Sequence, residues 1–505
     1  MKYSVALTED IHKAAYEHLI RLDRQEDLCF ALWFPSQGHT RKTALIWKLI
    51  LPGSGDRKVH GNASFTGRYF ERAIGEAVKA GGGLALMHSH PGPGWQGMSS
   101  DDISAERNHA AATKGATGLP IVGLTIGTDG AWSARFWEKT KPRTYERFWC
   151  ESVRVVGDAL NITFMDELMP VPKFRKNLDR TISAWGHKKQ AVLSRLKIGI
   201  IGLGSVGSII SEALARMGVS HVKLMDFDTI EYVNLDRTLH AYEDDSTTGR
   251  AKVAAAANAF RKSATSEKVT VELLEWSVTE EQGFRDALDC DILFSCVDRP
   301  WPRAALNLIA YAHLVPVVDG GIAIKIKSNG TMRSADWKSH IVGPGRKCLE
   351  CLGQYDSGLV SADREGYFDD PTYIQNLPMD HSIKRNENVF AFSLSTASFH
   401  VLQMLSMIVA PSGLANVGAQ NYHFVTGALD VDRDKCKESC LYPSFTAKGD
   451  STGIVVTGIH AKAEEARALR LKSGTASQTW RDRIVVLYHA MMGTVRRAFL
   501  KILKT

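Results

Sequence analysis

The sequence predicts an α/β protein of two domains, the second built on a doubly wound parallel sheet. At 505 residues the chain is too long for one hydrophobic core. In its second half, short apolar runs typical of strands alternate with helical patterns, which is the rhythm of a parallel sheet with crossover helices. The segment Met169–Lys173 carries two prolines, which oppose a helix and favour an extended connection between the two parts.

The composition predicts an ordinary globular protein. Apolar residues make up 44% of the chain and charged residues 23%, and the net charge of +7 is too small for the dense basic face of a nucleic-acid-binding protein. The first residues include acids and a histidine where a secretory signal needs an apolar run, and no run of uninterrupted apolar residues reaches membrane-spanning length. We therefore expect a cytoplasmic protein that binds neither nucleic acid nor membranes.

The first domain, residues 1–168, mixes the two kinds of pattern and is expected to be α/β. Helical patterns cover residues 11–22 and 69–79, and strand-like runs cover 44–51, 83–87 and 120–126. A linker at 169–177 follows.

A candidate metal site follows the strand-like run that ends at Met87. His88 and His90 are two residues apart, so on an extended strand their side chains point the same way. The Gly/Pro-rich loop after them can bring back an acid from Asp101-Asp102. Two imidazoles and one carboxylate are the ligand set of a catalytic zinc, which lowers the pKa of a bound water enough to attack an amide carbonyl.

These residues resemble the motif of the JAMM, or MPN-plus, zinc metalloproteases, which is His-x-His-Pro, a short loop and Ser-x-x-Asp. Ser99 and Asp102 fit the second half of the motif, although the loop is one residue longer than usual, and Asp101 stays open as the alternative ligand. The resemblance implies a deubiquitinase-like isopeptidase in which Ser99 binds the oxyanion. It further implies that Glu26, which precedes an apolar run, shuttles the proton.

The second domain, residues 178–445, opens with a helical stretch at 178–196 and a strand-like run at 197–201. Further strand-like runs are expected at 221–225, 291–296 and 315–319, with helices at 206–217, 251–261 and 303–313.

A candidate nucleotide-binding loop with Gly202, Gly204 and Gly207 follows the first of these strands, and Asp226 follows the next one. The glycines permit a tight turn, the helix N-terminus offers amides to phosphate, and the acid can hold ribose hydroxyls. This pattern alone fits an NAD dehydrogenase equally well.

Further polar groups favour a triphosphate over a dinucleotide. They are Asp228, Asn234, Arg237, Lys252 and Asp298. Arg237 and Lys252 can stabilise charge on the α-phosphate and the departing pyrophosphate, and Asp298 can hold magnesium.

From about Arg175 to Asp430 this order resembles the adenylating domain of ubiquitin-activating enzymes and of the ThiF and MoeB proteins, which activate sulfur carriers for thiamin and molybdopterin. The resemblance implies that ATP and magnesium are used. Asp226 or Asp228 would contact ribose, Asn234 and the two basic residues would contact the phosphates, and Asp298 would be needed for adenylation. Arg180 matches an arginine that reaches the neighbouring protomer's ATP site, which implies a homodimer. Thr238 departs from the family's glutamine.

Four of the eight cysteines form two close pairs, Cys348/Cys351 and Cys436/Cys440. Four thiolates in this grouping predict a structural zinc. No other cysteine has the features of a thioester-forming nucleophile, and if the pairs bind no metal, one of these four becomes that candidate. Beyond Pro443 we expect a helical tail, residues 446–505, with helices at 461–472 and 480–504.

We expect both domains to act on one small protein. The first would cleave after the C-terminal glycine of a ubiquitin-like protein, and the second would adenylate the exposed carboxylate before transfer to a conjugating enzyme. In the alternative, the cargo is a sulfur carrier of cofactor biosynthesis; in a third interpretation, one domain has lost catalysis and only binds the cargo. A bacterial conjugation system, including an antiviral one, suits such a fusion by analogy with the family.

Overall fold

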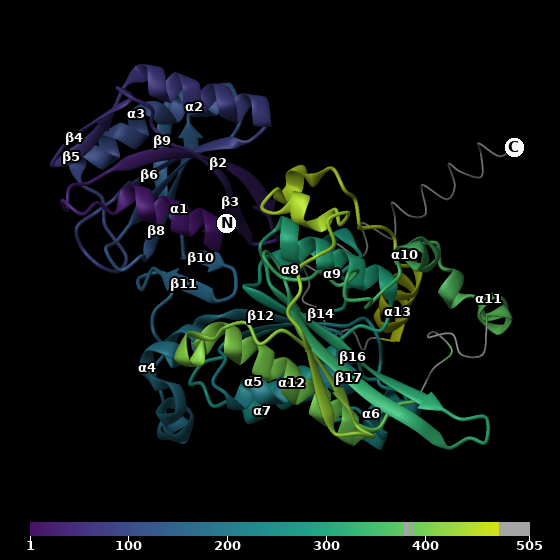
Figure 1. Cartoon of the computed structure of the whole chain (residues 1–505). Coiled ribbons are helices and arrows are strands. Elements are labelled where there is room, and N and C mark those ends of the chain that lie inside the picture. The colour runs from purple at the N-terminus through teal and green to yellow at the C-terminus, as the bar shows by residue number, and fades with distance from the viewer. Residues whose placement is uncertain (378–383, 385–386, 474–505) are drawn as a thin grey trace, which may run out of the picture.

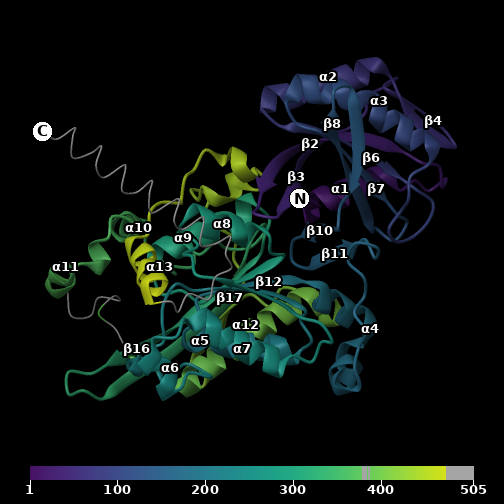
Figure 2. The same ribbon diagram turned by 180° about the vertical axis from the view of Figure 1, so that it is seen from behind.

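A computed structural model of the chain describes residues 1–377, 384 and 387–473 (Figure 1). The helix expected at 480–504 lies outside these residues. The described part contains two large sheets, one in each expected domain, and Figure 2 shows the same two bodies from behind.

The N-terminal domain is a mixed sheet with helices on both faces. Its strand order is β11-β10-β1-β3-β2-β6-β7-β8-β9. The strands are β1 (Lys2–Thr8), β2 (Leu28–Gln37), β3 (Arg41–Ile50), β6 (Gly83–Ser89), β7 (Ile121–Ile126), β8 (Trp132–Lys141), β9 (Thr144–Trp149), β10 (Ser152–Val156) and β11 (Leu160–Phe164). The helices are α1 (Glu9–Leu19), α2 (Gly67–Ala80) and α3 (Ser100–Thr117), and β4 (Arg57–His60) and β5 (Asn62–Phe65) form a separate hairpin.

Alternate residues of the central strand β2 face opposite sides of the sheet, so the sheet lies as a middle layer between helices on both faces. Cys29 and Trp33 pack in the apolar cluster that contains Ala15 of α1. Phe30 and Leu32 point the other way, into the cluster formed with α2 and α3. The expected strands and helices of this domain are present. Strands β1 and β8 to β11, which we did not predict, complete the sheet, and helix α3 was also not predicted.

The second domain is doubly wound, as the sequence predicted, with an antiparallel extension. Strands β14-β13-β12-β15-β16 are parallel. They are β12 (Lys197–Ile201), β13 (His221–Met225), β14 (Thr270–Leu274), β15 (Ile292–Ser295) and β16 (Val317–Ile326). The expectation of an all-parallel sheet was incomplete, because β16 turns back into β17 (Met332–Val342), which then pairs with β18 (Ala419–His423) and β19 (Ala428–Asp432).

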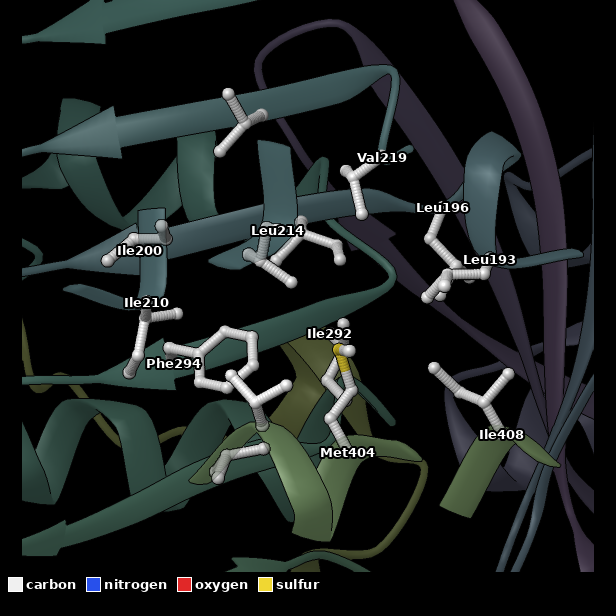
Figure 3. Close-up of a cluster of buried hydrophobic side chains, with 14 of the residues drawn as sticks. Leu193, Leu196, Ile200, Ile210, Leu214, Val219, Ile292, Phe294, Met404 and Ile408 are labelled. Atoms are coloured by element: carbon white, nitrogen blue, oxygen red, sulfur yellow. The ribbon is translucent and has the colours of Figure 1, made fainter. Parts of the chain in front are cut away.

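Helices cover both faces of this sheet. The helices of the first face are α4 (Asp179–Arg195), α5 (Ser205–Arg216), α7 (Lys252–Ser263) and α12 (Phe390–Val409). The opposite face carries α8 (Glu281–Leu288) and α9 (Pro300–Ala312). Figure 3 shows the core of the first face, where Ile200 and Phe294 of the sheet pack with Leu214 and Met404 of the helices. The shorter helices are α6 (Glu243–Thr248), α10 (Ser357–Arg364), α11 (Pro371–Asn376) and α13 (Ala461–Ser473).

Within the described residues, α12 is the one helix long and apolar enough to cross a membrane. Its most apolar window is 56% buried, and it packs against β16, β17 and α5. A core helix of a folded domain has the same length and composition.

The two domains share buried contacts. Arg41 Nη1 donates to Asp291 Oδ1 at 2.6 Å, and Ser36 Oγ lies 2.8 Å from His313 Nδ1. The chain beyond residue 445 also touches both, since Lys448 Nζ lies 3.2 Å from the centre of the Trp47 ring and Asp450 accepts from Arg285. This part of the tail therefore belongs to the folded body.

Candidate metal and nucleotide sites

The candidate catalytic zinc ligands come together at the end of β6. His88 Nε2 and His90 Nε2 are 3.2 Å apart, and the two carboxylate oxygens of Asp102 lie 3.3 Å and 3.2 Å from these nitrogens. Ligand atoms about 2.0–2.1 Å from a tetrahedral zinc are about 3.3 Å apart, and each of these three pairs has about that separation, although the two histidines face different oxygens of Asp102. The donor set fits zinc.

The start of α3 explains why Asp102 faces the histidines. Ser99 is the N-cap, and its Oγ accepts from Asp102 N at 3.1 Å while its own N–H donates to Asp102 Oδ2 at 2.7 Å. This capping box holds the carboxylate in place. Asp101, the alternative ligand, is exposed and points elsewhere, with Asn62 Nδ2 3.5 Å from its carboxylate.

Glu26 lies just before β2 at the edge of this site. Its Oε1 is 4.0 Å from His90 Nε2, and its backbone N–H donates to Gly61 O. Burial raises the pKa of the Glu26 carboxyl, although the two histidines oppose this shift. The next residue, Asp27, is fixed by Arg57 and by Ser89 Oγ, so the backbone that carries Glu26 is held on both sides.

The glycine loop between β12 and α5 opens onto a cavity of about 810 Å³. Gly202 has φ +92, and a Cβ there would meet Cys296 O at 2.5 Å. A Cβ at Gly207 would meet Gly202 O at 2.0 Å, so helix and loop can approach this closely only through glycine. Gly204 lines the cavity and has open space around it, which leaves room for phosphate at the N-terminus of α5.

The two candidate ribose acids both line the cavity. Asp226 accepts from Leu203 N at 2.7 Å and from Asp228 N at 2.8 Å, so it also braces the glycine loop. Burial raises the pKa of the Asp226 carboxyl, while Lys252 acts in the opposite direction. Asp228 is more exposed and pairs with Lys252 Nζ at 2.8 Å.

The candidate phosphate and magnesium residues line the same cavity. They are Asn234, Arg237, Lys252 and Asp298. Arg237 Nη1 donates to Val233 O and to Asp236 Oδ1. Arg180 is exposed on α4 and does not line the cavity of its own chain.

Sequence reasoning missed several residues of the cavity wall. Arg303 and His400 come from α9 and α12, and His460 and Lys462 come from the segment assigned to the tail. The sequence Asp319-Gly320-Gly321, at the end of an apolar run, could have indicated one part of this wall, because Gly320 and Gly321 line the cavity. The tail residues carried no recognisable motif.

The four paired cysteines meet in one cluster, in which Cys348 Sγ lies 3.6 Å from Cys440 Sγ. Tetrahedral zinc with Zn–S bonds of about 2.3 Å places sulfurs about 3.8 Å apart, so the cluster fits a structural zinc. Backbone N–H groups of Cys348 and Cys351 donate to sulfurs of the cluster, as expected for thiolates. By contrast Cys29, Cys150 and Cys290 are buried, and burial raises the pKa of each of these thiols.

Known proteins resemble the second domain. The profile of the ThiF family matches residues 177–439, more than half of the chain. Molybdopterin-synthase adenylyltransferase of Escherichia coli is 28% identical over 191 residues, 38% of this chain and 72% of that protein. Sulfur carrier protein ThiS adenylyltransferase of Bacillus subtilis is 33% identical over 179 residues, 35% of this chain and 49% of that protein.

Other relatives share shorter segments. Ubiquitin-like modifier-activating enzyme 5 of Drosophila melanogaster is 30% identical over 122 residues, 22% of this chain and 29% of that protein. Among solved structures, Escherichia coli MccB with ATP has a TM-score of 0.40 and 17% identity over 54% of this chain and 75% of that one, which is too weak a likeness for a conclusion. The extent of the profile match is decisive: this chain belongs to the ThiF family.

Proposed function

We propose that the second domain uses ATP to adenylate the C-terminal carboxylate of a ubiquitin-like or sulfur-carrier protein that ends in glycine. The observation that carries this proposal is the single cavity shared by the glycine loop, Arg237, Lys252 and Asp298. The ThiF family membership and the adenylyltransferases among the relatives support it.

The chemistry follows from the charges in the cavity. The cargo carboxylate attacks the α-phosphate of ATP, an acyl-adenylate forms, and pyrophosphate leaves. Lys252 and Arg237 stabilise the negative charge that moves onto the pyrophosphate. Asp298 would hold magnesium, which neutralises phosphate charge when it is bound. Arg180 would act in the cavity of a second protomer, so we propose a homodimer.

We further propose that the N-terminal domain is a zinc isopeptidase of the JAMM type. The observation that favours this second activity is the close approach of the His88, His90 and Asp102 side chains, with donor atoms 3.2–3.3 Å apart. Bound zinc would supply a water of lowered pKa. Glu26 is placed to accept a proton beside His90, and the Ser99 hydroxyl, which accepts from Asp102 N, keeps its own proton to donate to an oxyanion.

Together the two activities would process and activate one cytoplasmic cargo. Trimming after its terminal glycine would expose the carboxylate that the second domain adenylates. Transfer to a conjugating enzyme would follow for a ubiquitin-like cargo, and formation of a thiocarboxylate would follow for a sulfur carrier. Outside the four-cysteine cluster, Cys29, Cys150 and Cys290 are buried, and Cys296 is half-buried in the cavity wall, where burial raises the pKa of its thiol. These settings favour a thiol on the partner for the thioester.

Intact mass spectrometry tests both activities together. Glycine-tailed small proteins, each with and without a C-terminal extension, are incubated with the enzyme, ATP, magnesium and zinc. We expect trimming of the extended form and an AMP adduct on the mature form. His88→Ala should abolish only trimming, whereas Asp298→Ala should abolish only the adduct. Loss of neither product in these variants would show that the assigned sites do not perform the reactions.

A further inference from the structure

The chain that follows the matched residues 177–439 returns to the nucleotide cavity. His460 and Lys462, at the start of α13, line the cavity together with Phe227 and Trp276. Figures 1 and 2 both show α13 beside α10, on the second domain. These two residues therefore add a wall to the cavity from outside the segment that carries the family resemblance.

This wall is anchored at three points. Trp301 Nε1 donates to Val456 O at 2.7 Å, and Gly458 N donates to Thr279 O at 2.8 Å. Further on, the buried guanidinium of Arg467 makes two hydrogen bonds with the carboxylate of Glu280. Thr279 and Glu280 follow directly after the cavity residues 276–278, so the anchors fix His460 relative to the cavity.

Aromatic neighbours fix the plane of the His460 ring. It stacks on Trp301 with ring centres 5.8 Å apart and an angle of 7° between the planes. The centre of the Phe227 ring lies 4.7 Å from that of His460, with an angle of 52° between the planes. Phe227 stands between the two acids Asp226 and Asp228, so the imidazole is held next to the residues expected to bind ribose.

Hydrogen bonding fixes the tautomer of the ring. The backbone N–H of Ala463 donates to His460 Nδ1 at 3.3 Å, and His460 O accepts from Glu464 N, so His460 is the N-cap of α13. Burial lowers the pKa of this imidazole, which keeps it neutral near pH 7. A neutral ring that accepts at Nδ1 carries its proton at Nε2.

We propose that His460 binds the nucleoside half of ATP and donates a hydrogen bond from Nε2 to the base or the ribose. The phosphates belong at the glycine loop, and the acids after β13 belong at the ribose. His460, Phe227 and Trp276 therefore form the end of the cavity that takes the nucleoside. This inference rests on the proposed ATP-dependent function of the second domain.

Two substitutions distinguish the acceptor role of Nδ1 from the donor role of Nε2. His460→Asn keeps an acceptor near Nδ1 and preserves the helix cap, but it removes the donor at Nε2. His460→Gln places an amide donor near Nε2. Ile459→Ala is the matched control, because Ile459 is the exposed neighbour and does not line the cavity.

The measurement is the Kd of each full-length protein for ATP with magnesium, by isothermal titration calorimetry, beside a thermal melt. We expect His460→Asn to raise the Kd about tenfold, the worth of one hydrogen bond, and to leave the melt unchanged. We expect His460→Gln to stay within about threefold of wild type and Ile459→Ala to match it. Inorganic triphosphate, which lacks a nucleoside, should bind all four proteins equally.

The result also separates this inference from the proposed function. If wild type binds ATP, Lys252→Ala weakens binding and His460→Asn binds as wild type does, the inference is wrong and the proposed function stands. If wild type binds no ATP, both are wrong. An equal loss of affinity for inorganic triphosphate in His460→Asn would also overturn the inference, because it would indicate a general disturbance of the cavity.

Discussion

Arg41 of β3 and Asp291, just before β15, form an ion pair of 2.6 Å across the two domains, with side chains only 1% and 2% exposed. Arg154 Nη1 donates to the same carboxylate oxygen at 2.9 Å. Buried charges are costly unless they are paired, so this contact is satisfied in only one arrangement of the domains. The candidate metal site and the candidate nucleotide cavity are therefore held at a fixed separation.

Removing Arg41 should destabilise the whole chain. Arg41→Met leaves the buried carboxylate of Asp291 with fewer partners, and breaking a buried pair in this way costs about 3–5 kcal/mol. Urea denaturation of the full chain measures the free energy of unfolding. Arg107→Met, at an exposed position of α3, is the control and should change it by less than about 0.5 kcal/mol. A similar small effect for both variants would mean that the ion pair does not hold the interface.

The same contact predicts loss of stability in acid. Burial alone would raise the pKa of the Asp291 carboxyl, but Arg41 and Arg154 hold it below its ordinary value. A carboxyl with a lowered folded-state pKa contributes stability that is fully present above its unfolded pKa of about 3.9 and is lost as the pH falls below that value. The free energy of unfolding should therefore begin to fall near about pH 4 and keep falling as the pH is lowered towards the depressed folded-state pKa. Asp291→Asn should flatten this slope, and an unchanged slope would contradict the assignment.

The sequence was sufficient for the parts of the fold that follow local rules. Strand-like runs and helical patterns located β12, β13, β15, α5, α7 and α9 because each is a continuous apolar pattern with a clear boundary. The antiparallel strands β17 to β19 were missed. The turns at Asn329-Gly330, between β16 and β17, and at residues 424–427, between β18 and β19, are local. The pairing of β17 with β18 joins residues almost ninety positions apart, which no local pattern specifies.

Some residues of the candidate sites also follow local rules, whereas others are placed only by tertiary contacts. His88 and His90 could be predicted because two residues on one strand point the same way, and the capping box that decides between Asp101 and Asp102 is itself a local motif. His460 could not be predicted. It reaches the cavity only because tertiary contacts hold its segment there. Trp301 donates to Val456 O and Arg467 donates to Glu280, and each contact joins residues more than 150 positions apart.

Metal analysis tests the two candidate zinc sites independently. Purified full-length protein should contain about two zinc ions per chain by inductively coupled plasma mass spectrometry, one for each donor set. His88→Ala should reduce this number to about one without unfolding the protein, and Cys348→Ser should also remove one. His187→Ala, at an exposed histidine outside both donor sets, should remove none. Zinc-free wild type would refute both assignments.

Ser99 should have two separable roles. Ser99→Ala loses the N-cap of α3, which costs about 1 kcal/mol of stability, and the oxyanion donor, which lowers peptidase kcat by about 10²–10³. Ser99→Asp restores a capping oxygen but not a hydroxyl, so it should recover stability and not activity. Ser100→Ala is the adjacent exposed control. Recovery of activity together with stability in Ser99→Asp would show that the serine acts only as a cap.

ATP–pyrophosphate exchange with a glycine-tailed small protein tests the central claim most directly. Wild type should catalyse exchange only when the cargo is present, because the acyl-adenylate forms and reverses at its carboxylate. Lys252→Ala should lower the rate by about 10²–10³, whereas Lys262→Ala, at an exposed position on the same helix, should leave it unchanged. An exchange rate that is the same in Lys252→Ala as in wild type, or no exchange with any glycine-tailed cargo, would contradict the account.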